Sequence, residues 1–224
     1  MRGYWDGVNP LIAPGVYHPQ EDTALLAAAL SDEPLPQGAD VLDVGTGCGA
    51  LALAAARRGH RVTAVDVSWR AVWSARVNAW RYRLPVSIRH GNLFEPVRGQ
   101  TFDVILANPP YVPDPDDSRA PQGRARSWDG GSDGRLLVDR ICREAPGLLR
   151  PGGVLLMVHS ALSDPDRTVG QLRAAGLKAA VTRRQRIAFG PVLRERADWL
   201  RERGLLAPSE NKEELVVVRA ELPV

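Results

Sequence analysis

The sequence predicts an α/β domain with one doubly wound, mainly parallel sheet of seven strands, the last of them antiparallel. Short β-branched and apolar runs alternate with helical patterns from residue 41 onward, which is typical of parallel sheets covered by helices on both faces. A glycine-rich turn joins the first of these strands to the helix that follows it. The last two strands follow one another with no intervening crossover of this kind, so we expect them to pair as a hairpin.

The chain of 224 residues fits one such domain with a full core. Its two cysteines, Cys48 and Cys142, have no metal-ligand spacing around them, so we expect no disulfide scaffold, no metal and a reducing cytoplasmic location. We also expect no membrane segment, since no apolar run approaches the length that spans a bilayer. The net charge of +3 is a weak argument for nucleic-acid binding.

The first half of the chain is predicted as follows. Residues 1–19 are rich in glycine and proline and should form an irregular arm before the domain at 20–224. Acidic residues at the start of the next segment and leucines on one face predict a helix over 20–30. The next elements are strands at 41–44, 62–67, 86–89 and 102–107 and helices at 50–58 and 70–81. The apolar positions of the last helix are Val72, Trp73, Val77 and Trp80.

The second half begins with a long polar loop that should form part of a substrate cleft. Asp114, Asp116 and Asp117 in this loop could equally form a solvated stretch. The pattern then predicts helices at 135–149 and 168–175 and strands at 154–158, 178–182 and 214–219. The stretch 183–209 interrupts the last pair as an arginine-rich insertion, which we interpret as a solvated helix because acidic residues interleave with the arginines.

The glycine-rich turn predicts a nucleotide-type ligand. Gly45, Gly47 and Gly49 follow the strand at 41–44 and would let the backbone approach a ligand closely. Asp66 ends the next strand about 20 positions later, the spacing at which a carboxylate accepts hydrogen bonds from the ribose hydroxyls of an adenosine cofactor.

Asp43 decides which cofactor this turn favours. The glycine pattern also fits the fingerprint of dinucleotide-binding proteins. However, the carboxylate of Asp43 at the lip of the turn would repel a pyrophosphate and attract an ammonium or a sulfonium group. We therefore expect S-adenosyl-L-methionine rather than NAD.

Asn108-Pro109-Pro110-Tyr111 follows the buried strand at 102–107. Two prolines cannot continue a sheet, so the chain must leave it at Asn108 in a stiff, extended turn. This places an amide side chain, free carbonyl groups and an aromatic ring at the carboxyl end of a strand, where open α/β sheets bind ligands. Such a group suits a planar, neutral nitrogen.

The turn His90-Gly91-Asn92-Leu93-Phe94 follows the third strand. A polar side chain beside a large apolar one could bind the edge and face of an adenine ring. A plain strand-ending turn explains the same residues equally well.

Together these motifs resemble the class I S-adenosylmethionine-dependent methyltransferases, and within them the HemK-like glutamine methyltransferases that modify translation release factors. Tyr17-His18-Pro19-Gln20-Glu21-Asp22-Thr23 is similar to the Tyr-x-Pro-x-Glu-Asp-Thr stretch in the short form of that family. Trp128-Asp129-Gly130-Gly131 with Gly134 is similar to its Trp-x-Gly-Gly-x-x-Gly segment. The resemblance covers about residues 16–220 and implies the Rossmann-like methyltransferase fold.

The resemblance implies roles for individual residues. Asn108, Pro109 and Tyr111 would hold the target nitrogen. The cofactor would be held by Thr23, Asp43, Gly45, Gly47, Asp66, Asn92, Leu93 and Asn108. The partner would be a protein that presents a glutamine, and some eukaryotic relatives also need a small zinc-containing subunit.

Two departures leave the acceptor open. Position 92 is usually aspartate in the family and is asparagine here, and the stretch after Arg183 is longer than in the short form. The Asn-Pro-Pro-Tyr motif is also found in adenine-N6 and guanine-N2 methyltransferases of nucleic acids. Nucleic-acid amino methylation and small-molecule N-methylation therefore stay as alternatives.

Overall fold

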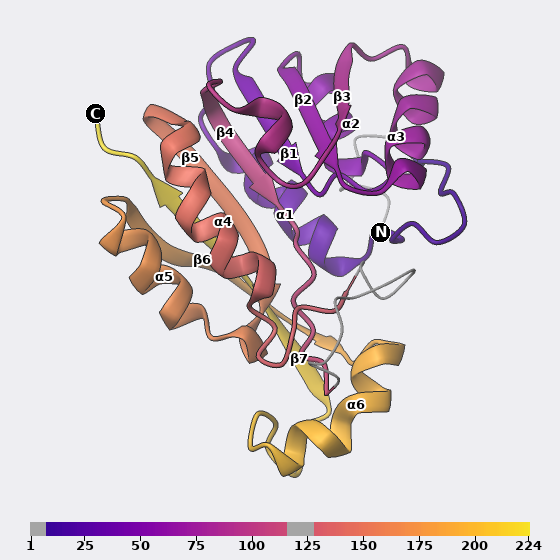
Figure 1. Ribbon diagram of the computed structural model, residues 1–224, viewed down its shortest axis with the longest axis vertical. Helices are drawn as coiled ribbons and strands as arrows, with labels where there is room; N and C mark the ends of the chain where they lie inside the picture. The colour runs from indigo at the N-terminus through magenta and orange to yellow at the C-terminus, as the bar shows by residue number, and fades with distance from the viewer. Residues whose placement is uncertain (1–7, 116–127) are drawn as a thin grey trace.

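The computed structural model describes residues 8–115 and 128–224 and contains one sheet of seven strands in the order β3-β2-β1-β4-β5-β7-β6 (Figure 1). The strands are β1 (Asp40–Val44), β2 (Arg61–Asp66), β3 (Val86–His90), β4 (Phe102–Ala107), β5 (Leu149–Ser160), β6 (Lys178–Ala188) and β7 (Lys212–Glu221). Strands β1 to β5 pair in parallel, and β7 runs antiparallel between β5 and β6. The predicted fold class is confirmed.

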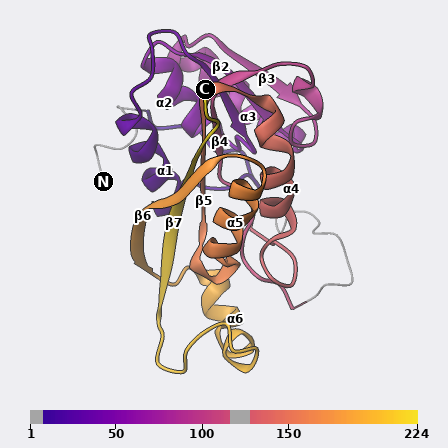
Figure 2. The ribbon, with the colours of Figure 1, turned by 90° about the vertical axis from the view of Figure 1, so that its left-hand side faces the viewer.

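Helices cover both faces of the sheet, as Figure 2 shows. They are α1 (Glu21–Asp32), α2 (Ala50–Arg57), α3 (Trp69–Tyr82), α4 (Leu136–Glu144), α5 (Pro165–Ala174) and α6 (Pro191–Glu202). Helix α2 packs against α1 and α3, while α4 packs against α5 on the opposite face. Short 3₁₀ turns at Glu95–Val97, Ala145–Leu148 and Ala161–Ser163 complete the elements. Within the described part of the chain, none of the helices is long and apolar enough to cross a membrane.

The described residues before α1 contain no helix or strand, and they are tied to α3. Asn78 accepts a hydrogen bond from the Leu11 amide and donates to the Leu11 carbonyl, and its amide group also donates to the Cys48 carbonyl. The Tyr82 hydroxyl makes a similar pair of contacts with the backbone of Asn9. These contacts fix the path by which the chain enters α1.

Helix α3 lies where the sequence predicts it, and most of its large apolar side chains are exposed. Trp73, Val77 and Trp80 are 62%, 41% and 81% exposed, and of the four predicted apolar positions only Val72 is buried. At 100° per residue these three side chains project from one side of the helix together with Trp69. The opposite side carries alanines, which allow α3 to pack closely on its neighbours.

Strand β6 is longer than predicted. The prediction ended it at Thr182 because charged residues follow, but the strand continues to Ala188 and pairs with β7 over this length. Arg184 forms an ion pair with Glu214 on β7. Charged side chains are normal on an edge strand, where one side of the backbone is unpaired. The arginine-rich stretch is thus partly strand and partly α6.

Strand β5 and helix α4 also differ in extent. β5 begins at Leu149, before the turn at Pro151, and the helix predicted to reach Leu149 ends at Glu144 and continues as a 3₁₀ turn. Pro146 lies in this turn and cannot supply the backbone donor that an α-helix would require. Neither difference moves the elements that carry the glycine-rich and Asn-Pro-Pro-Tyr turns.

Candidate functional site

The site lies where the carboxyl ends of β1 and β4 meet. These strands are neighbours in the sheet, and from them the chain continues in opposite directions, to β2 and to β5. This is the switch point at which open α/β sheets bind ligands. A Cβ atom on Gly45 would lie 4.0 Å from the Asn108 carbonyl oxygen, so the glycine-rich turn and the Asn-Pro-Pro-Tyr turn lie side by side.

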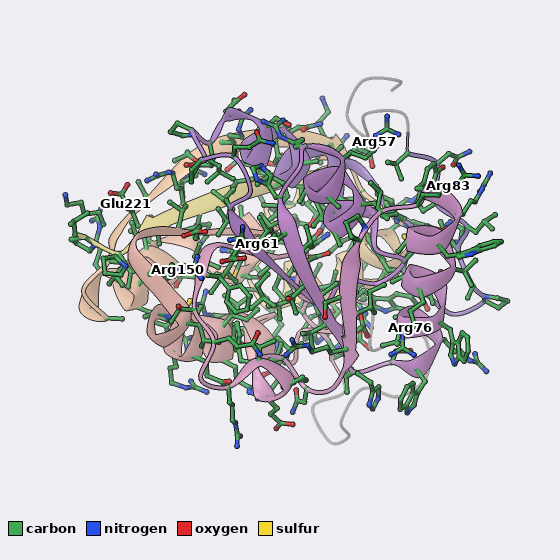
Figure 3. All side chains as sticks on the ribbon, turned by 90° about the horizontal axis from the view of Figure 1, so that it is seen from above. Arg57, Arg61, Arg76, Arg83, Arg150 and Glu221 are labelled. Carbon is green, nitrogen blue, oxygen red and sulfur yellow. The ribbon has the colours of Figure 1, made fainter. Side chains whose placement is uncertain are left out.

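The opposite end of the sheet has a groove of about 630 Å³ lined by Arg61 and Arg150. Figure 3 looks onto this end of the molecule and labels both arginines. Asp40 pairs with Arg61 and Arg150 at 2.7 Å, and Asp103 pairs with Arg150 at 2.8 Å. Because these charges already neutralise one another, this groove has no evident ligand chemistry.

The glycine-rich turn is held open by Asp66. Gly45, Gly47 and Gly49 have φ values of +74°, +56° and +87°, which residues with side chains rarely adopt. Asp66 accepts a hydrogen bond from the Gly47 amide at 2.9 Å and one from the Ser68 amide at 2.8 Å. Each carboxylate oxygen keeps a lone pair for a further donor, such as a ribose hydroxyl.

Asp43 is a buried carboxyl with one unused oxygen. Its Oδ2 accepts hydrogen bonds from the Thr46 hydroxyl at 2.6 Å and the Ala52 amide at 3.1 Å. Its Oδ1 has no partner among the residues that the structure describes. Burial raises the pKa of Asp43 to about 6, against the lowering effect of these two bonds. An unpaired buried carboxyl oxygen requires a partner, and the ammonium group of S-adenosylmethionine fits this requirement.

Asn92 and Leu93 follow β3 on the adjacent side. Leu93 is buried at φ +49°, a strained backbone conformation for a leucine. Asn92 Oδ1 accepts a hydrogen bond from Arg140 of α4 at 3.2 Å. Arg140 was not predicted from the sequence, and it accounts for how the amide of Asn92 is oriented.

The start of α1 meets the end of β4 at the other side of the site. Asn108 donates through Nδ2 to Asp22 Oδ2 at 3.0 Å and to Thr23 Oγ1 at 3.3 Å. The Tyr111 hydroxyl donates to the same Asp22 oxygen at 3.2 Å. The structure thus brings Thr23 against Asn108, 85 residues away in sequence. Asp22 was interpreted only as a helix-start residue, although its place in the Tyr17-to-Thr23 motif was a signal for more.

Two further ionisable groups, Tyr17 and Glu213, lie near Asp22. Tyr17 donates to Asp22 Oδ2 at 2.9 Å. Burial, together with the charge of Asp22, raises the pKa of Tyr17 and Tyr111, so both hydroxyls stay protonated. Glu213 of β7 is buried, and burial raises its pKa to about 7. Its Oε1 has no partner in the described part of the chain. Sequence patterns gave no sign of Glu213, because it lies in a charged run at the start of a strand.

The segment 128–134 packs against the backbone of the Asn-Pro-Pro-Tyr turn and of Val112, the residue after it. The Val112 amide donates to the Trp128 carbonyl at 2.8 Å, and the Gly130 amide donates to the Val112 carbonyl at 2.9 Å. A Cβ atom on Gly134 would lie 2.3 Å from the Tyr111 carbonyl oxygen. The glycines of this motif therefore allow a close backbone approach that fixes the position of Tyr111.

One arginine of helix α6 binds two segments, the one that follows the Asn-Pro-Pro-Tyr turn and the one that begins at Trp128. Arg196 is 16% exposed and forms an ion pair with the buried Asp129 at 2.6 Å and a longer one with Asp114 at 3.4 Å. It also donates to the Pro113 carbonyl at 2.9 Å. The interpretation of a purely solvated arginine helix is therefore wrong at this position. Figure 1 shows α6 at the foot of β7. Asp116 and Asp117 lie outside the described residues.

Comparison with solved structures shows the same fold. The chain aligns with the structure of an Encephalitozoon cuniculi Mtq2-Trm112 complex that methylates the termination factor eRF1, with a TM-score of 0.66 and 24% identity, over 93% of this chain and 99% of that one. It also aligns with the Thermus thermophilus 16S rRNA N2 G1207 methyltransferase, with a TM-score of 0.61 and 23% identity, over 93% of this chain and 46% of that one.

Comparison with related sequences identifies the family within this fold. The methyltransferase small domain model matches residues 12–120. Release factor glutamine methyltransferases of Geobacter sulfurreducens and Gloeobacter violaceus are 35% and 39% identical over 76% of this chain, which spans 62% and 63% of their length. A Methanocaldococcus jannaschii protein with the provisional name protein N5-glutamine methyltransferase is 36% identical over 82% of this chain and 92% of its own length. The chain is therefore a methyltransferase that belongs to the HemK-like glutamine methyltransferase family.

Proposed function

We propose that this protein transfers the methyl group of S-adenosyl-L-methionine to the side-chain amide of a glutamine in a release-factor-like protein. The observation that carries this proposal is the placement of Asn108, which is held by Asp22 and Thr23 directly beside the glycine-rich turn. The names of the relatives support the glutamine acceptor.

The cofactor site is built from the residues at the ends of β1, β2 and β3. Asp43 Oδ1 would accept a hydrogen bond from the ammonium group of the cofactor. The backbone of Gly45 and Gly47 would lie along the methionine part of the cofactor, which carries the sulfonium. Asp66 would accept from the ribose hydroxyls. The adenine would lie against Leu93 and Asn92, and Thr23 would close the site beside Asn108. When bound, this cofactor supplies an electrophilic methyl group.

The residues at the end of β4 make the acceptor nitrogen reactive. An amide nitrogen is a poor nucleophile because its lone pair is delocalised into the carbonyl group. Asn108 Oδ1 and the Pro109 carbonyl would accept hydrogen bonds from its two N–H groups and turn the lone pair toward the methyl group. As the new N–C bond forms and the S–C bond breaks, the nitrogen would give up one proton to water, which leaves a neutral N-methyl amide. The buried ring of Tyr111 would pack on the planar amide and hold its orientation. Positioning in a dry, preorganised polar site is the main source of rate in such a reaction.

Asn108→Ala tests the mechanism directly. We expect this variant to retain binding of S-adenosylmethionine and to lose about 10²–10³ in turnover, by analogy with the loss of one oxyanion-hole donor. Calorimetry measures the first quantity and transfer of a tritiated methyl group measures the second. Wild-type turnover in Asn108→Ala would refute the assigned role.

The acceptor is identified with purified release factor and its glutamine-to-glutamate variant as matched substrates. We expect label in the first and none in the second. Labelling of a lysate that disappears with nuclease and persists with protease would instead establish nucleic-acid methylation and overturn the proposal.

Helix α3 carries exposed apolar side chains that a partner protein could cover. Trp69, Trp73, Val77 and Trp80 form an exposed apolar strip, which we call the α3 aromatic face. An apolar strip of this size on a helix is typical of a protein interface, and tryptophan and arginine dominate the energetic centres of such interfaces. The segment 67–94 contains five arginines and no acidic residue; they are Arg70, Arg76, Arg81, Arg83 and Arg89. Figure 3 shows Arg83 at the end of α3.

We infer that a small acidic protein subunit covers the α3 aromatic face. A second copy of this chain fits poorly, because arginines would face arginines. The Mtq2 neighbour is in a complex with Trm112, which supports a subunit of this kind.

The test compares Trp73→Glu/Trp80→Glu with Leu136→Glu, which alters a 51% exposed leucine on α4. Only the tryptophan variant should lose an acidic partner that copurifies with the wild type. If both variants bound the acidic partner equally well, the α3 aromatic face would not be its binding site. A nucleic acid or a second copy of this chain bound at this face would also contradict the inference.

A further inference from the structure

Asp22 is the most heavily hydrogen-bonded carboxylate at the site. Its Oδ2 accepts from the Tyr17 hydroxyl at 2.9 Å, Asn108 Nδ2 at 3.0 Å and the Tyr111 hydroxyl at 3.2 Å. Its Oδ1 accepts from the backbone amide and the hydroxyl of Thr23. The side chain is buried, and these donors replace the water that a buried carboxylate loses.

This arrangement decides which way the amide of Asn108 faces. A carboxylate only accepts hydrogen bonds, so the NH₂ group of Asn108 must face Asp22. Its second N–H points to Thr23 Oγ1, which is itself committed as a donor to Asp22. Both donors of the Asn108 amide are therefore used. Among the described residues, neither Asn108 Oδ1 nor the Pro109 carbonyl accepts a hydrogen bond.

We propose that Asp22 is a positioning residue that locks Asn108 with Oδ1 toward the acceptor, so that the site accepts only a nitrogen with two N–H bonds. This inference rests on the proposed function. A primary amide has both donors, whereas a glutamate side chain has none and would face two acceptors. An amide that has received one methyl group keeps a single N–H. The site should therefore release a monomethylated product and not methylate it again.

Asp22→Asn removes the lock while keeping the shape of the side chain. The new amide at position 22 can face Asn108 with either its oxygen or its nitrogen, so Asn108 is no longer held in one orientation. We expect kcat/KM for the acceptor to fall roughly tenfold to a hundredfold, the effect of one lost charge-assisted hydrogen bond, with cofactor affinity unchanged.

Tyr17→Phe is the matched control, because it removes one donor from the same Asp22 oxygen and leaves the Asn108 contact intact. Its acceptor kcat/KM should fall clearly less than that of Asp22→Asn, because Asp22 keeps its charge and still accepts from the Asn108 amide. Equal losses in Asp22→Asn and Tyr17→Phe would show that Asp22 only stabilises the pocket, and wild-type kinetics in Asp22→Asn would refute the lock.

Asn108→Asp gives a signature that a purely structural role cannot produce. Two adjacent carboxyl groups share one proton, so the new carboxyl at position 108 should be repelled by Asp22 when it is ionised. When it is protonated, it can donate to Asp22 and present its carbonyl oxygen to the acceptor. The activity of Asn108→Asp should therefore rise as pH falls. The double variant Asp22→Asn/Asn108→Asp should not show this rise.

The wild-type pH profile is the reference for this measurement. Tyr17, Tyr111 and Glu213 also face Asp22, and the wild-type profile over the same range measures their contribution. A flat profile for Asn108→Asp would contradict the proposal.

Nuclear magnetic resonance separates this inference from the proposed function, since it needs no acceptor. Hydrogen exchange of the Asn108 side-chain NH₂ should be slow in the wild type and in Tyr17→Phe, and at least roughly tenfold faster in Asp22→Asn, since the anchoring bond is lost. Fast exchange in the wild type would overturn the lock even if glutamine is methylated. Slow exchange without glutamine methylation would leave the lock intact and refute only the acceptor.

Discussion

Asp43 should make cofactor binding depend on pH. The pKa of the free carboxyl is raised to about 6 by burial, and the ammonium group would require the ionised form. Below this pH a proton must leave before binding, so affinity should weaken about tenfold per pH unit. At pH 8, Asp43→Asn should bind the cofactor roughly tenfold to a hundredfold more weakly and lose the pH dependence.

Calorimetry from pH 5 to 8 measures this effect. Asp40→Asn, which changes an acid at the other end of β1, is the control and should bind as the wild type does. An unchanged pH profile in Asp43→Asn would contradict the role of this carboxyl.

Gly134 should be intolerant of any side chain. Its φ is +71°, and a Cβ atom at this position would lie 2.3 Å from the Tyr111 carbonyl oxygen, so Gly134→Ala must displace the Tyr111 backbone. We expect turnover to fall by about 10², the cost that a misplacement of about 1 Å carries in well-aligned sites. Gly147→Ala, at a glycine with open space around it, is the control for steady-state assays. Equal activity of the two variants would show that segment 128–134 does not brace the site.

At the residue scale, local spacing in the sequence indicates some of the candidate site residues and not others. Asp43, Gly45 and Asn108 were predicted because each sits at a fixed offset from a strand end. Asp22 and Glu213 escaped prediction because their positions depend on contacts between distant parts of the chain, such as the Asn108–Asp22 bond across 86 residues. Local spacing cannot encode such contacts, so a buried carboxyl of this kind looks like an ordinary helix-start or surface residue.

Among the elements, α3 and α6 show how sequence patterns mislead. Both lie near their predicted positions, yet the residue types on their surfaces do not indicate which side is covered. Apolar residues usually mark the buried side of a helix, but α3 packs with alanines and exposes its tryptophans. Charged residues usually mark the solvated side, but Arg196 of α6 is largely covered and pairs with the buried Asp129. In both helices a neighbouring element decides which face is covered.

Arg196 should control acceptor binding through the two segments that it holds. Removing one member of a buried ion pair typically costs about 3–5 kcal/mol, because the other charge is left without a partner. In Arg196→Met, the buried carboxyl group of Asp129 would lose this ion pair. We expect a raised KM for the protein acceptor, unchanged cofactor affinity and lower stability to urea.

Arg194→Met, an exposed arginine on the same helix, should leave all three quantities unchanged. Adding Asp129→Asn to Arg196→Met should recover part of the stability. A raised KM in Arg194→Met alone would instead indicate that the exposed arginines bind the acceptor.

The fold of the whole molecule was predictable because its alternating strands and helices leave few topologies. The order of strands β5, β7 and β6 was not predictable, because the insertion of β7 between β5 and β6 leaves no trace in local periodicity. The pairing of β6 with β7 was predicted, and the pairing of β7 with β5 came only from the structure.

Two buried groups give the fold opposite responses to pH. The pKa of Glu213 is raised from 4.5 to about 7 by burial, so the unfolded chain releases this proton first and stability falls as pH rises through that range. The pKa of His159 is lowered from 6.5 to about 4 by burial, so stability is lost as pH falls through its own range.

Glu213→Gln should therefore be more stable than the wild type at pH 8 and similar to it at pH 4.5. The gain at pH 8 is up to roughly 3 kcal/mol, less the cost of an unpaired buried amide. Urea denaturation at both pH values measures it. Glu202→Gln, at an exposed position of α6, should show no such difference. A loss of stability in Glu213→Gln at pH 8 would contradict the raised pKa of Glu213 as the cause of this pH dependence.

The position of β7 also sets the order in which the molecule can be completed during synthesis. The residues predicted to hold the cofactor are all present once residue 108 has been made, and β1, β2 and β4 can pair at that stage. Arg196 and Glu213, which we propose to border the acceptor site, are made later, and β6 has no place in the sheet until β7 separates it from β5. A nascent chain should therefore acquire its cofactor cradle about a hundred residues, or roughly 5–20 s of synthesis, before it can recognise a substrate.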